Sequence, residues 1–296
     1  MAACCGNGAA LLAPDWRSKN ERFWLVLLQV CVSATLAARG WLTWKWDSPV
    51  RGLVWQEEWW SGLLEKQFSI PWEEFAKKSD PVITSGLALI GCLLIALAIA
   101  PWLAGRFPKG RWLLWVAAFL LLVDSVARWV GKDYDFGMAI EHSLQMFTPV
   151  ALYFALSFPK RIRAVALGIA VATALTFIGH GFYAAGIHPV PLSYQTMTAK
   201  LLGTGGEATL RFLLIAGWLD IMAAIALFIA PLRRPALLYC LGWGLLTALA
   251  RVVSHFNFSV SGWALDPWLA ETLVRSSHWM MPLLLLGLLR RDSRLP

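Results

Sequence analysis

The sequence predicts an all-α protein that crosses a membrane eight times, built from two four-helix repeats in parallel orientation. The first observation is composition, since 58% of the 296 residues are hydrophobic and only 15% are charged, as is typical of membrane proteins. The second is that apolar runs of about 20 residues, the length that crosses the hydrocarbon core, recur along the chain. The third is that local patterns of the first half return in the same order in the second half.

The apolar runs are separated by short polar or basic segments, so each run predicts one membrane-spanning helix. The first run follows a polar lead, and no small-residue cleavage site comes after it, which favours a retained span over a signal peptide. The lipid bilayer is therefore the first predicted partner. The eight predicted spans are 23–42, 82–103, 111–130, 138–158, 163–185, 208–230, 235–254 and 268–289.

Lysine and arginine predict the orientation. They are concentrated in the tails, 1–22 and 290–296, and after the second, fourth and sixth runs, although the segment 43–81 also holds several. Because basic residues favour the cytoplasmic side, we expect a bacterial inner-membrane protein with both termini in the cytoplasm. The net charge of +8 forms no continuous basic face, which excludes nucleic acid as a partner. The basic residues that follow the second, fourth and sixth runs are Arg106, Lys109, Arg111, Lys160, Arg161, Arg163, Arg233 and Arg234.

The two predicted repeats are residues 23–158 and 159–289, with four spans each. Because four is an even number, we expect the repeats to share one orientation and to be related by a pseudo-two-fold axis along the membrane normal. Four stretches of the first repeat align, in the same order, with stretches of the second. They are 32–44 with 171–186, 93–106 with 221–234, 126–130 (VARWV) with 249–253 (LARVV), and 142–149 with 275–282, which both end in proline.

The first helix of the second repeat ends in Phe177-Ile-Gly-His180-Gly181-Phe-Tyr, where the first repeat has Ala38-Arg39-Gly40. A four-span unit with this small-residue and HG-like element resembles the DoxX family of small bacterial membrane proteins. The resemblance implies a four-helix fold and an association with membrane redox chemistry, as a quinone-linked or electron-transfer subunit. It implies no specific activity.

The loop at 43–81 has no counterpart of equal length in the second repeat. It is rich in tryptophan, which prefers the membrane–water interface, so we expect one or two short helices on the outer membrane surface. Ser69, followed by Pro71 and by Glu73, predicts a helix start. A ligand lid is the alternative interpretation, and a membrane or periplasmic redox partner could dock on this loop.

Polar side chains inside the predicted spans gather towards their outer ends. In the last span, Glu271, Arg275, His278 and Pro282 share one helix face, because they stand at i, i+4, i+7 and i+11. Ionisable groups in hydrocarbon usually face a bundle interior or a wet cavity, so we predict a polar cavity near the periplasmic side. Its predicted catalytic residues, for proton transfer or head-group hydrogen bonding, are His180, His278, Glu271 and Glu141, and its predicted substrate-binding residues are Arg275, Arg251, Arg39, His142, Gln145 and Asp220.

Several functions fit such a cavity, and the sequence leaves them open. Histidine beside carboxylates can relay protons, which favours a quinone-like redox molecule. Two histidines on facing helices could instead hold a b-type haem, and arginines could bind a small anionic solute in a transporter or sensor. Pairs such as Asp124 and Arg128 could also simply lock helices in a structural subunit. The chain has no HExxH, P-loop, GxGxxG or CxxC motif, so no metal site is predicted.

Overall fold

The structure is a computed structural model that describes residues 19–257 and 262–291. Within these residues every regular element is a helix. Seven helical stretches of this part are long and apolar enough to cross a membrane, which confirms an all-α, multi-pass membrane protein. Predictions for tail residues 1–18 and 292–296 lie outside the described residues. The seven stretches are Arg22–Lys45, Trp72–Arg106, Pro108–Val130, Pro159–Ala184, Gly206–Ala226, Arg233–His255 and Asp266–Leu289.

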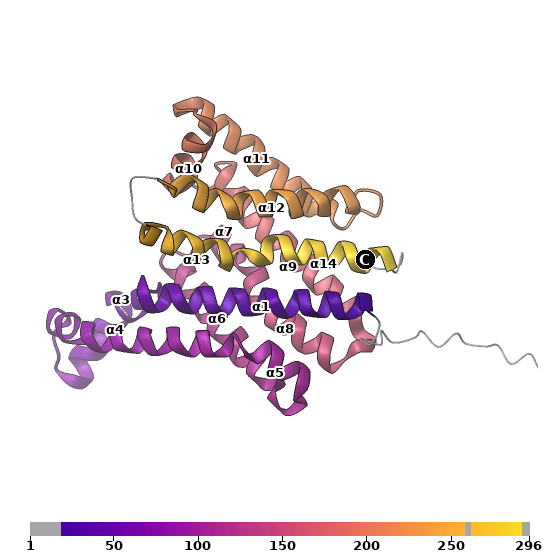
Figure 1. Ribbon diagram of the computed structural model, residues 1–296. Coiled ribbons are helices and arrows are strands. Elements are labelled where there is room, and N and C mark those ends of the chain that lie inside the picture. Colours follow the sequence, from indigo (N-terminus) through magenta and orange to yellow (C-terminus); the bar gives the residue numbers. More distant parts are fainter. Residues whose placement is uncertain (1–18, 258–261, 292–296) are drawn as a thin grey trace, which may run out of the picture.

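The long helices lie side by side and roughly parallel (Figure 1). The first half of the chain contributes α1 (Lys19–Lys45), α4 (Trp72–Leu97), α6 (Leu113–Val130), α7 (Phe136–Glu141) and α8 (Ser143–Ser157). The second half contributes α9 (Ile162–Ala184), α11 (Gly206–Ala226), α12 (Arg233–His255), α13 (Asp266–Val274) and α14 (Ser276–Arg291). The shorter α-helices are α2 (Val50–Val54), α3 (Glu57–Leu63), α5 (Ala100–Arg106) and α10 (Leu192–Leu202).

The fourth predicted span, 138–158, is divided into α7 and α8 at His142, so neither piece alone has the length of a span. The last span is divided in the same way, because α13 ends and α14 begins on either side of Arg275. The two residues at the breaks have nearly the same backbone angles, φ −96° and ψ 7° at His142 and φ −85° and ψ 8° at Arg275. A proline follows seven residues after each break, Pro149 in α8 and Pro282 in α14.

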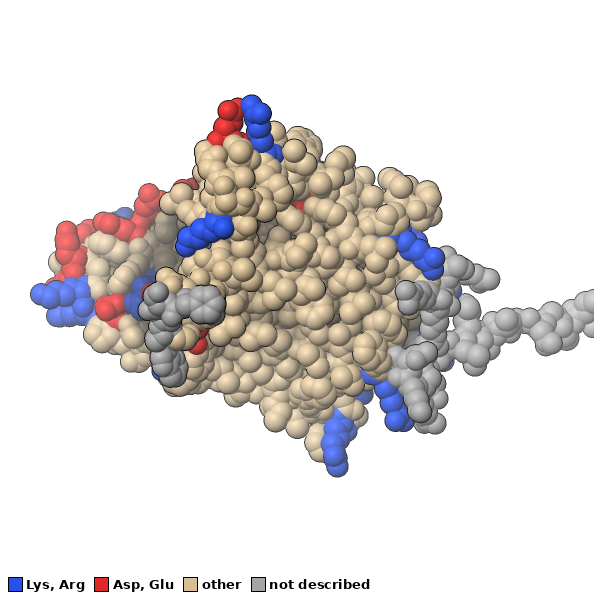
Figure 2. All heavy atoms as spheres, turned by 45° about the horizontal axis from the view of Figure 1, so that its top comes forward, with Lys and Arg blue, Asp and Glu red and all other residues tan. Residues whose placement is uncertain are grey.

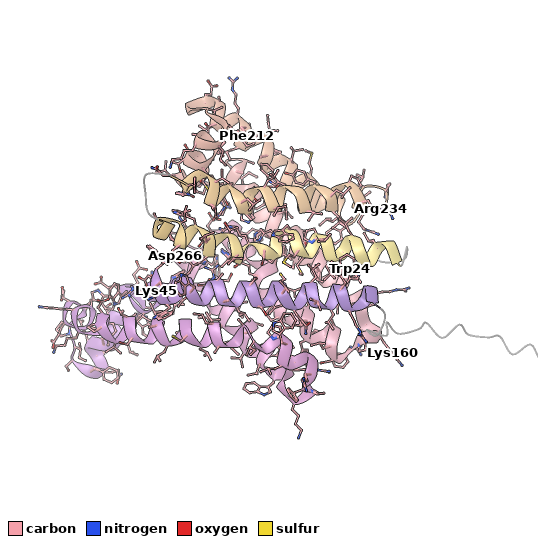
Figure 3. The ribbon with its side chains drawn as sticks, viewed as in Figure 1. Trp24, Lys45, Lys160, Phe212, Arg234 and Asp266 are labelled. Carbon is pink, nitrogen blue, oxygen red and sulfur yellow. The ribbon has the colours of Figure 1, made fainter. Side chains whose placement is uncertain are left out.

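Charged residues gather at the two ends of the helix bundle and leave a nearly uncharged belt between them (Figure 2). The Trp-rich end carries α2 and α3, and both acidic and basic residues are visible there. At the opposite, basic end, the face shown has lysine and arginine without visible acidic residues among the described part of the chain. Lys45 and Asp266 lie at the Trp-rich end, and Lys160 and Arg234 lie at the basic end (Figure 3). A belt of this kind is the surface that a bilayer would cover.

Two helices near the middle of the bundle make matching sets of contacts. α1 packs against α4 of its own half and against α13 and α14 of the second half, while α9 packs against α11 of its own half and against α7 and α8 of the first half. The within-half crossings both occur at glycine pairs, Gly40 with Gly91 and Gly181 with Gly217. A Cβ on any of these glycines would come within 2.3–2.8 Å of the neighbouring helix, so the close approach requires glycine.

The Trp-rich segment is shorter than the predicted loop 43–81. α1 continues to Lys45 and α4 begins at Trp72, ten residues before the apolar run that predicted it. Between them lie α2, α3 and a π-helical turn, Leu64–Phe68. Ser69 has φ 55° and ends that turn, while Glu73 lies in the first turn of α4. The helix therefore starts three residues after Ser69, with the expected acidic first turn.

Candidate functional site

The side chains of His180 and His278 meet between α9 and α14. Their Nε2 atoms lie 3.0 Å apart and their ring centroids 5.1 Å apart. His278 is buried at 3% exposure. An Nε2···Nε2 hydrogen bond needs one donor and one acceptor, so it holds one hydrogen between the two rings. The pair can therefore accept or pass on a single proton.

Glycines on both sides of His180 let neighbouring helices come close to the backbone of α9. On one side, a Cβ on Gly179 would lie 2.8 Å from the backbone of Glu141 in α7. On the other, a Cβ on Gly181 would lie 2.8 Å from the carbonyl oxygen of Gly217 in α11. The glycines of the GHG element thus position His180 between two helices.

The second ring nitrogen of His180 faces two further groups. Its Nδ1 shares a hydrogen bond of 2.9 Å with the hydroxyl of Tyr194 and lies 3.4 Å from Oε1 of Glu141. Burial raises the pKa of the Tyr194 phenol above its ordinary value, so this hydroxyl keeps its proton. A line of polar atoms therefore runs from Tyr194 and Glu141 through His180 to His278.

Tyr194 comes from α10, a helix that the sequence analysis did not predict. α10 begins after Pro191 and ends at Gly203, which has φ +64°, so both ends carry ordinary helix-boundary residues. The spacing of Tyr194, Met197 and Leu201 at i, i+3 and i+7 places them on one helix face. That spacing was the signal for a helix covering a cavity.

The histidine pair lines a pocket of about 440 Å³ enclosed by α9, α10, α11, α12 and α14. This volume lies within the usual range of about 300–1,000 Å³ for small-molecule sites. Most of the wall is apolar, with side chains such as Phe177, Phe212 and Trp243. The polar side chains of the wall are His180, Tyr194, Thr198, Asp220, Thr247, Arg251, Arg275 and His278.

Asp220 supplies a carboxylate to the wall of this pocket from the middle of α11. It is buried, and its Oδ1 accepts a hydrogen bond of 2.8 Å from the hydroxyl of Tyr239 in α12. A buried acid held by a neutral donor is less costly than a bare carboxylate. Tyr239 therefore joins α11 and α12 next to the pocket, a role that the sequence analysis did not assign.

Four polar residues of the first half, Arg39, Asp124, Arg128 and Gln145, form a network. Oδ2 of Asp124 lies 3.0 Å from Nε of Arg128 and 3.4 Å from Nε of Arg39. Nη2 of Arg39 donates a hydrogen bond of 3.0 Å to Oε1 of Gln145. Arg39 is 2% exposed, and it lines neither the pocket nor the polar cavity at the Trp-rich end. His142 is also buried, at the break between α7 and α8.

A second arginine–carboxylate–arginine group lies at the Trp-rich end of the second half. Glu271 contacts Arg275 directly through Oε2, and the same oxygen lies 3.8 Å from Nε of Arg251. Nη1 of Arg251 also donates to the carbonyl oxygen of Thr247 at 3.3 Å. The 3.8 Å separation is longer than a hydrogen bond, so Arg251 keeps donor capacity.

This second group borders a polar cavity of about 550 Å³, the vestibule, at the Trp-rich end. Arg251, Arg275 and Met197 line both the vestibule and the pocket. These side chains therefore form the partition between the two spaces. The charged and histidine side chains of the vestibule wall are Asp47, Arg128, Arg251, His255, Glu271 and Arg275.

The structure thus brings most of the predicted site residues to one end of the bundle. His180, His278, Asp220, Arg251 and Arg275 line the pocket. Glu271 lines the vestibule, and Glu141 reaches His180 from behind the pocket wall. The remaining three, Arg39, His142 and Gln145, line neither space.

Comparison with protein-family models finds no matching family, and comparisons with curated proteins and with solved structures find no significant match.

Proposed function

We propose that the protein binds a small lipophilic redox molecule of the quinone type in the pocket, with its head group at the histidine pair. The single observation that carries this proposal is the His180–His278 hydrogen bond on the wall of a mostly apolar pocket. Apolar walls with a few convergent polar groups are typical of small-molecule sites. A quinone needs hydrogen-bond donors at its carbonyl oxygens and apolar surroundings for its ring and tail.

Access from the bilayer fits this ligand. Leu246 and Val253 of α12 line the pocket and are 61% and 59% exposed. In a membrane these exposed side chains would face lipid. A lipophilic molecule could therefore enter sideways, between α12 and the helices α10 and α11, without crossing the aqueous phase.

The polar line behind the head group can exchange protons. Reduction of a quinone to a quinol adds two electrons and two protons. The shared hydrogen of His180 and His278 can move to a head-group oxygen, and a proton taken up from water by the Glu141 carboxylate can then pass to His180. Two such transfers supply the two protons of the quinol. The electrons would come from a partner redox protein, so the chain would act as the quinone-binding membrane subunit of a redox system.

Haem binding is less well supported than quinone binding. Metal–imidazole bonds of about 2.0–2.1 Å would hold two axial nitrogens about 4 Å apart, on opposite sides of the iron. The Nε2 atoms of His180 and His278 are 3.0 Å apart and bonded directly to each other. The pair therefore fits a hydrogen-bonded relay better than two haem ligands.

We further propose that the chain is a tandem duplication with eight membrane crossings, the fourth formed by α7 and α8 together. Support comes from the matching contacts of α1 and α9, from the glycine pairs at their crossings, and from the similar breaks at His142 and Arg275. In the alignment Arg39 stands where His180 stands, and Gln145 where His278 stands. Arg39 is hydrogen-bonded to Gln145 at 3.0 Å, and His180 to His278 at the same distance.

The DoxX-like assignment and the inner-membrane orientation stay proposals of the same kind. A basic end opposite a mixed, Trp-rich end (Figure 2) supports cytoplasmic termini. Single cysteines at Gly110 and at Ser69 test the orientation by labelling with a membrane-impermeant thiol reagent. We expect Ser69→Cys to react from outside and Gly110→Cys to be protected, and the opposite result would invert the orientation.

Thermal unfolding of the purified full-length chain in neutral detergent tests quinone binding. A short-chain quinone should raise the unfolding midpoint of the wild type, because a ligand that binds only the folded state stabilises it. The shift should be lost in His278→Ala and in His180→Ala. The matched control is His188→Ala, because His188 pairs with Asp135 at 2.9 Å and does not line the pocket. A wild type that shows no shift, or an equal shift in all variants, would contradict the proposal.

A further inference from the structure

The four arginines near the Trp-rich end outnumber their carboxylate partners. Arg39 and Arg128 share Asp124, and Arg251 and Arg275 share Glu271. Four positive charges thus meet two negative charges within these ion pairs. Counting the carboxylate of Glu141, which lies against His180, still leaves one positive charge in excess.

An excess positive charge at the end of a membrane-spanning bundle is costly unless an anion balances it. Burial makes the cost larger here, because the side chains of Arg251 and Arg275 are only 10% and 13% exposed. Both arginine side chains line the pocket and the vestibule. A negatively charged group in the vestibule would therefore be stabilised by both guanidinium groups.

Arg251 has unused donors and, unlike Arg39, lines both the pocket and the vestibule. In the first half, Asp124 stands four residues before Arg128 and takes a hydrogen bond from its Nε at 3.0 Å. In the second half, Thr247 stands four residues before Arg251 and offers only its backbone carbonyl oxygen, at 3.3 Å. A guanidinium has five N–H donors, and the shared Glu271 oxygen is 3.8 Å from its Nε. Arg251 therefore lacks the carboxylate that Arg128 has one helical turn earlier in its own helix.

We propose that the vestibule is a binding site for an oxyanion, a phosphate-type or carboxylate group held by Arg251 and Arg275. Its donors are the free N–H groups of Arg251, together with the guanidinium groups of Arg275 and Arg128, which also line the vestibule. Ser193 and Thr196 of α10 line the same space. The site shares Arg251 and Arg275 with the wall of the quinone pocket but does not use the histidine pair. Guanidinium groups favour such ligands because their planar N–H groups match the oxygens of an anion in pairs.

Two sources can supply this oxyanion. Arg251 and Arg275 form part of the partition between the vestibule and the apolar pocket, so one amphiphile could place its head in the vestibule and its chain in the pocket. The alternative is a free anion that enters the vestibule from the aqueous side. The bound group is the same in both cases, so the experiment must separate the sources.

The test uses the full-length chain in dodecyl maltoside at fixed ionic strength, with inorganic phosphate and dodecyl phosphate as probes. Binding is measured as the concentration dependence of the thermal unfolding midpoint. We expect at least one probe to stabilise the wild type. Stabilisation by inorganic phosphate identifies a free-anion site, whereas stabilisation by dodecyl phosphate alone identifies an amphiphile head-group site.

Two variants remove the site in different ways. Arg251→Gln removes the charge. Thr247→Asp adds a carboxylate four residues before Arg251, the position that Asp124 has relative to Arg128, so that Arg251 can pair with a group of the protein itself. Each should weaken binding at least about tenfold, because the anion loses a charge-assisted hydrogen bond from Arg251. Arg234→Gln is the control, because Arg234 lies at the basic end (Figure 3). The control should bind as the wild type does.

The outcomes separate this inference from quinone binding. His278→Ala should lose the quinone response and keep the phosphate response, because His278 does not line the vestibule. If neither probe stabilises the wild type, or if Thr247→Asp folds and binds phosphate as tightly as the wild type, the vestibule is not an oxyanion site. Failure of Arg251→Gln to fold leaves Thr247→Asp as the deciding variant.

Discussion

The imidazole of His180 meets the imidazole of His278 at 3.0 Å, in a place where the first half of the chain has an arginine and a glutamine at the same distance. The first pair, Arg39 and Gln145, is held inside a charged network. The histidine pair lines a pocket instead. Similar helix packing thus surrounds a buried polar network in the first half and borders a pocket in the second half.

The histidine pair leads to the first prediction. In His278→Gln the side-chain amide can still hydrogen-bond to His180, as Gln145 does to Arg39, but it cannot carry a proton between them. We expect this variant to fold with a midpoint close to that of the wild type and to bind a short-chain quinone. Proton uptake on quinone reduction, measured with a pH-indicating dye in proteoliposomes that contain a redox partner, should be slowed. An unchanged rate would exclude a relay through His278.

The second prediction concerns Asp220 and Tyr239. Asp220→Asn keeps an acceptor oxygen for the Tyr239 hydroxyl, so the free energy of unfolding, measured by thermal unfolding, should change by about 1 kcal/mol or less. Asp220→Leu leaves that hydroxyl unpaired beside the pocket and should cost about 1–3 kcal/mol. Equal stability of the two variants would mean that the hydrogen bond from Tyr239 contributes little.

The third prediction concerns the charged network of the first half. Asp124→Asn removes the carboxylate between Arg39 and Arg128 and leaves a buried arginine without its counter-charge. Breaking a buried pair in this way costs about 3–5 kcal/mol, so we expect a large loss of folded protein, measured by size-exclusion chromatography and thermal unfolding. Glu74→Gln is the control, because the Glu74–Lys78 pair is exposed and such pairs contribute about 1 kcal/mol or less.

The fourth prediction tests the helix crossing beside the pocket. A Cβ on Gly217 would lie 2.3 Å from the backbone nitrogen of Ala185, so Gly217→Ala must push α9 and α11 apart. Overpacking of this kind costs about 1–3 kcal/mol. Gly86→Ala in α4 is the matched control, because nothing lies within 4 Å of its added Cβ and alanine favours helix. If both variants unfold at the same temperature, the crossing tolerates more separation than the structure indicates.

Hydropathy and spacing predicted much of this arrangement. The apolar runs located the long helices, because the requirement for about 20 apolar residues in a span is strict. The positions i, i+4 and i+7 placed Glu271, Arg275 and His278 on one face, and these three residues do border the pocket or the vestibule. The alignment of the two halves also paired Arg39 with His180, which occupy matching places against α8 and α14.

Other features were not predicted from the sequence. The apolar run predicted too late a start for α4, because the first turns of this helix, from Trp72 onward, are polar and are not part of an apolar run. The breaks at His142 and Arg275 depend on backbone angles that spacing does not reveal. Tyr194 was missed because α10 is a short helix between spans, and hydropathy treats such a segment as a loop.

The central claim is that a lipophilic redox molecule occupies the pocket beside His180 and His278, and photoaffinity labelling tests it most directly. The purified chain is irradiated with an azido-quinone, and the labelled peptides are mapped by mass spectrometry with and without excess unlabelled quinone. We predict competable labelling of peptides from α10 and α12, including Tyr194, Met197 and Trp243, and its loss in His278→Ala. Labelling that is not competable, or that falls on lipid-facing residues of the first half such as Leu89, would contradict the claim.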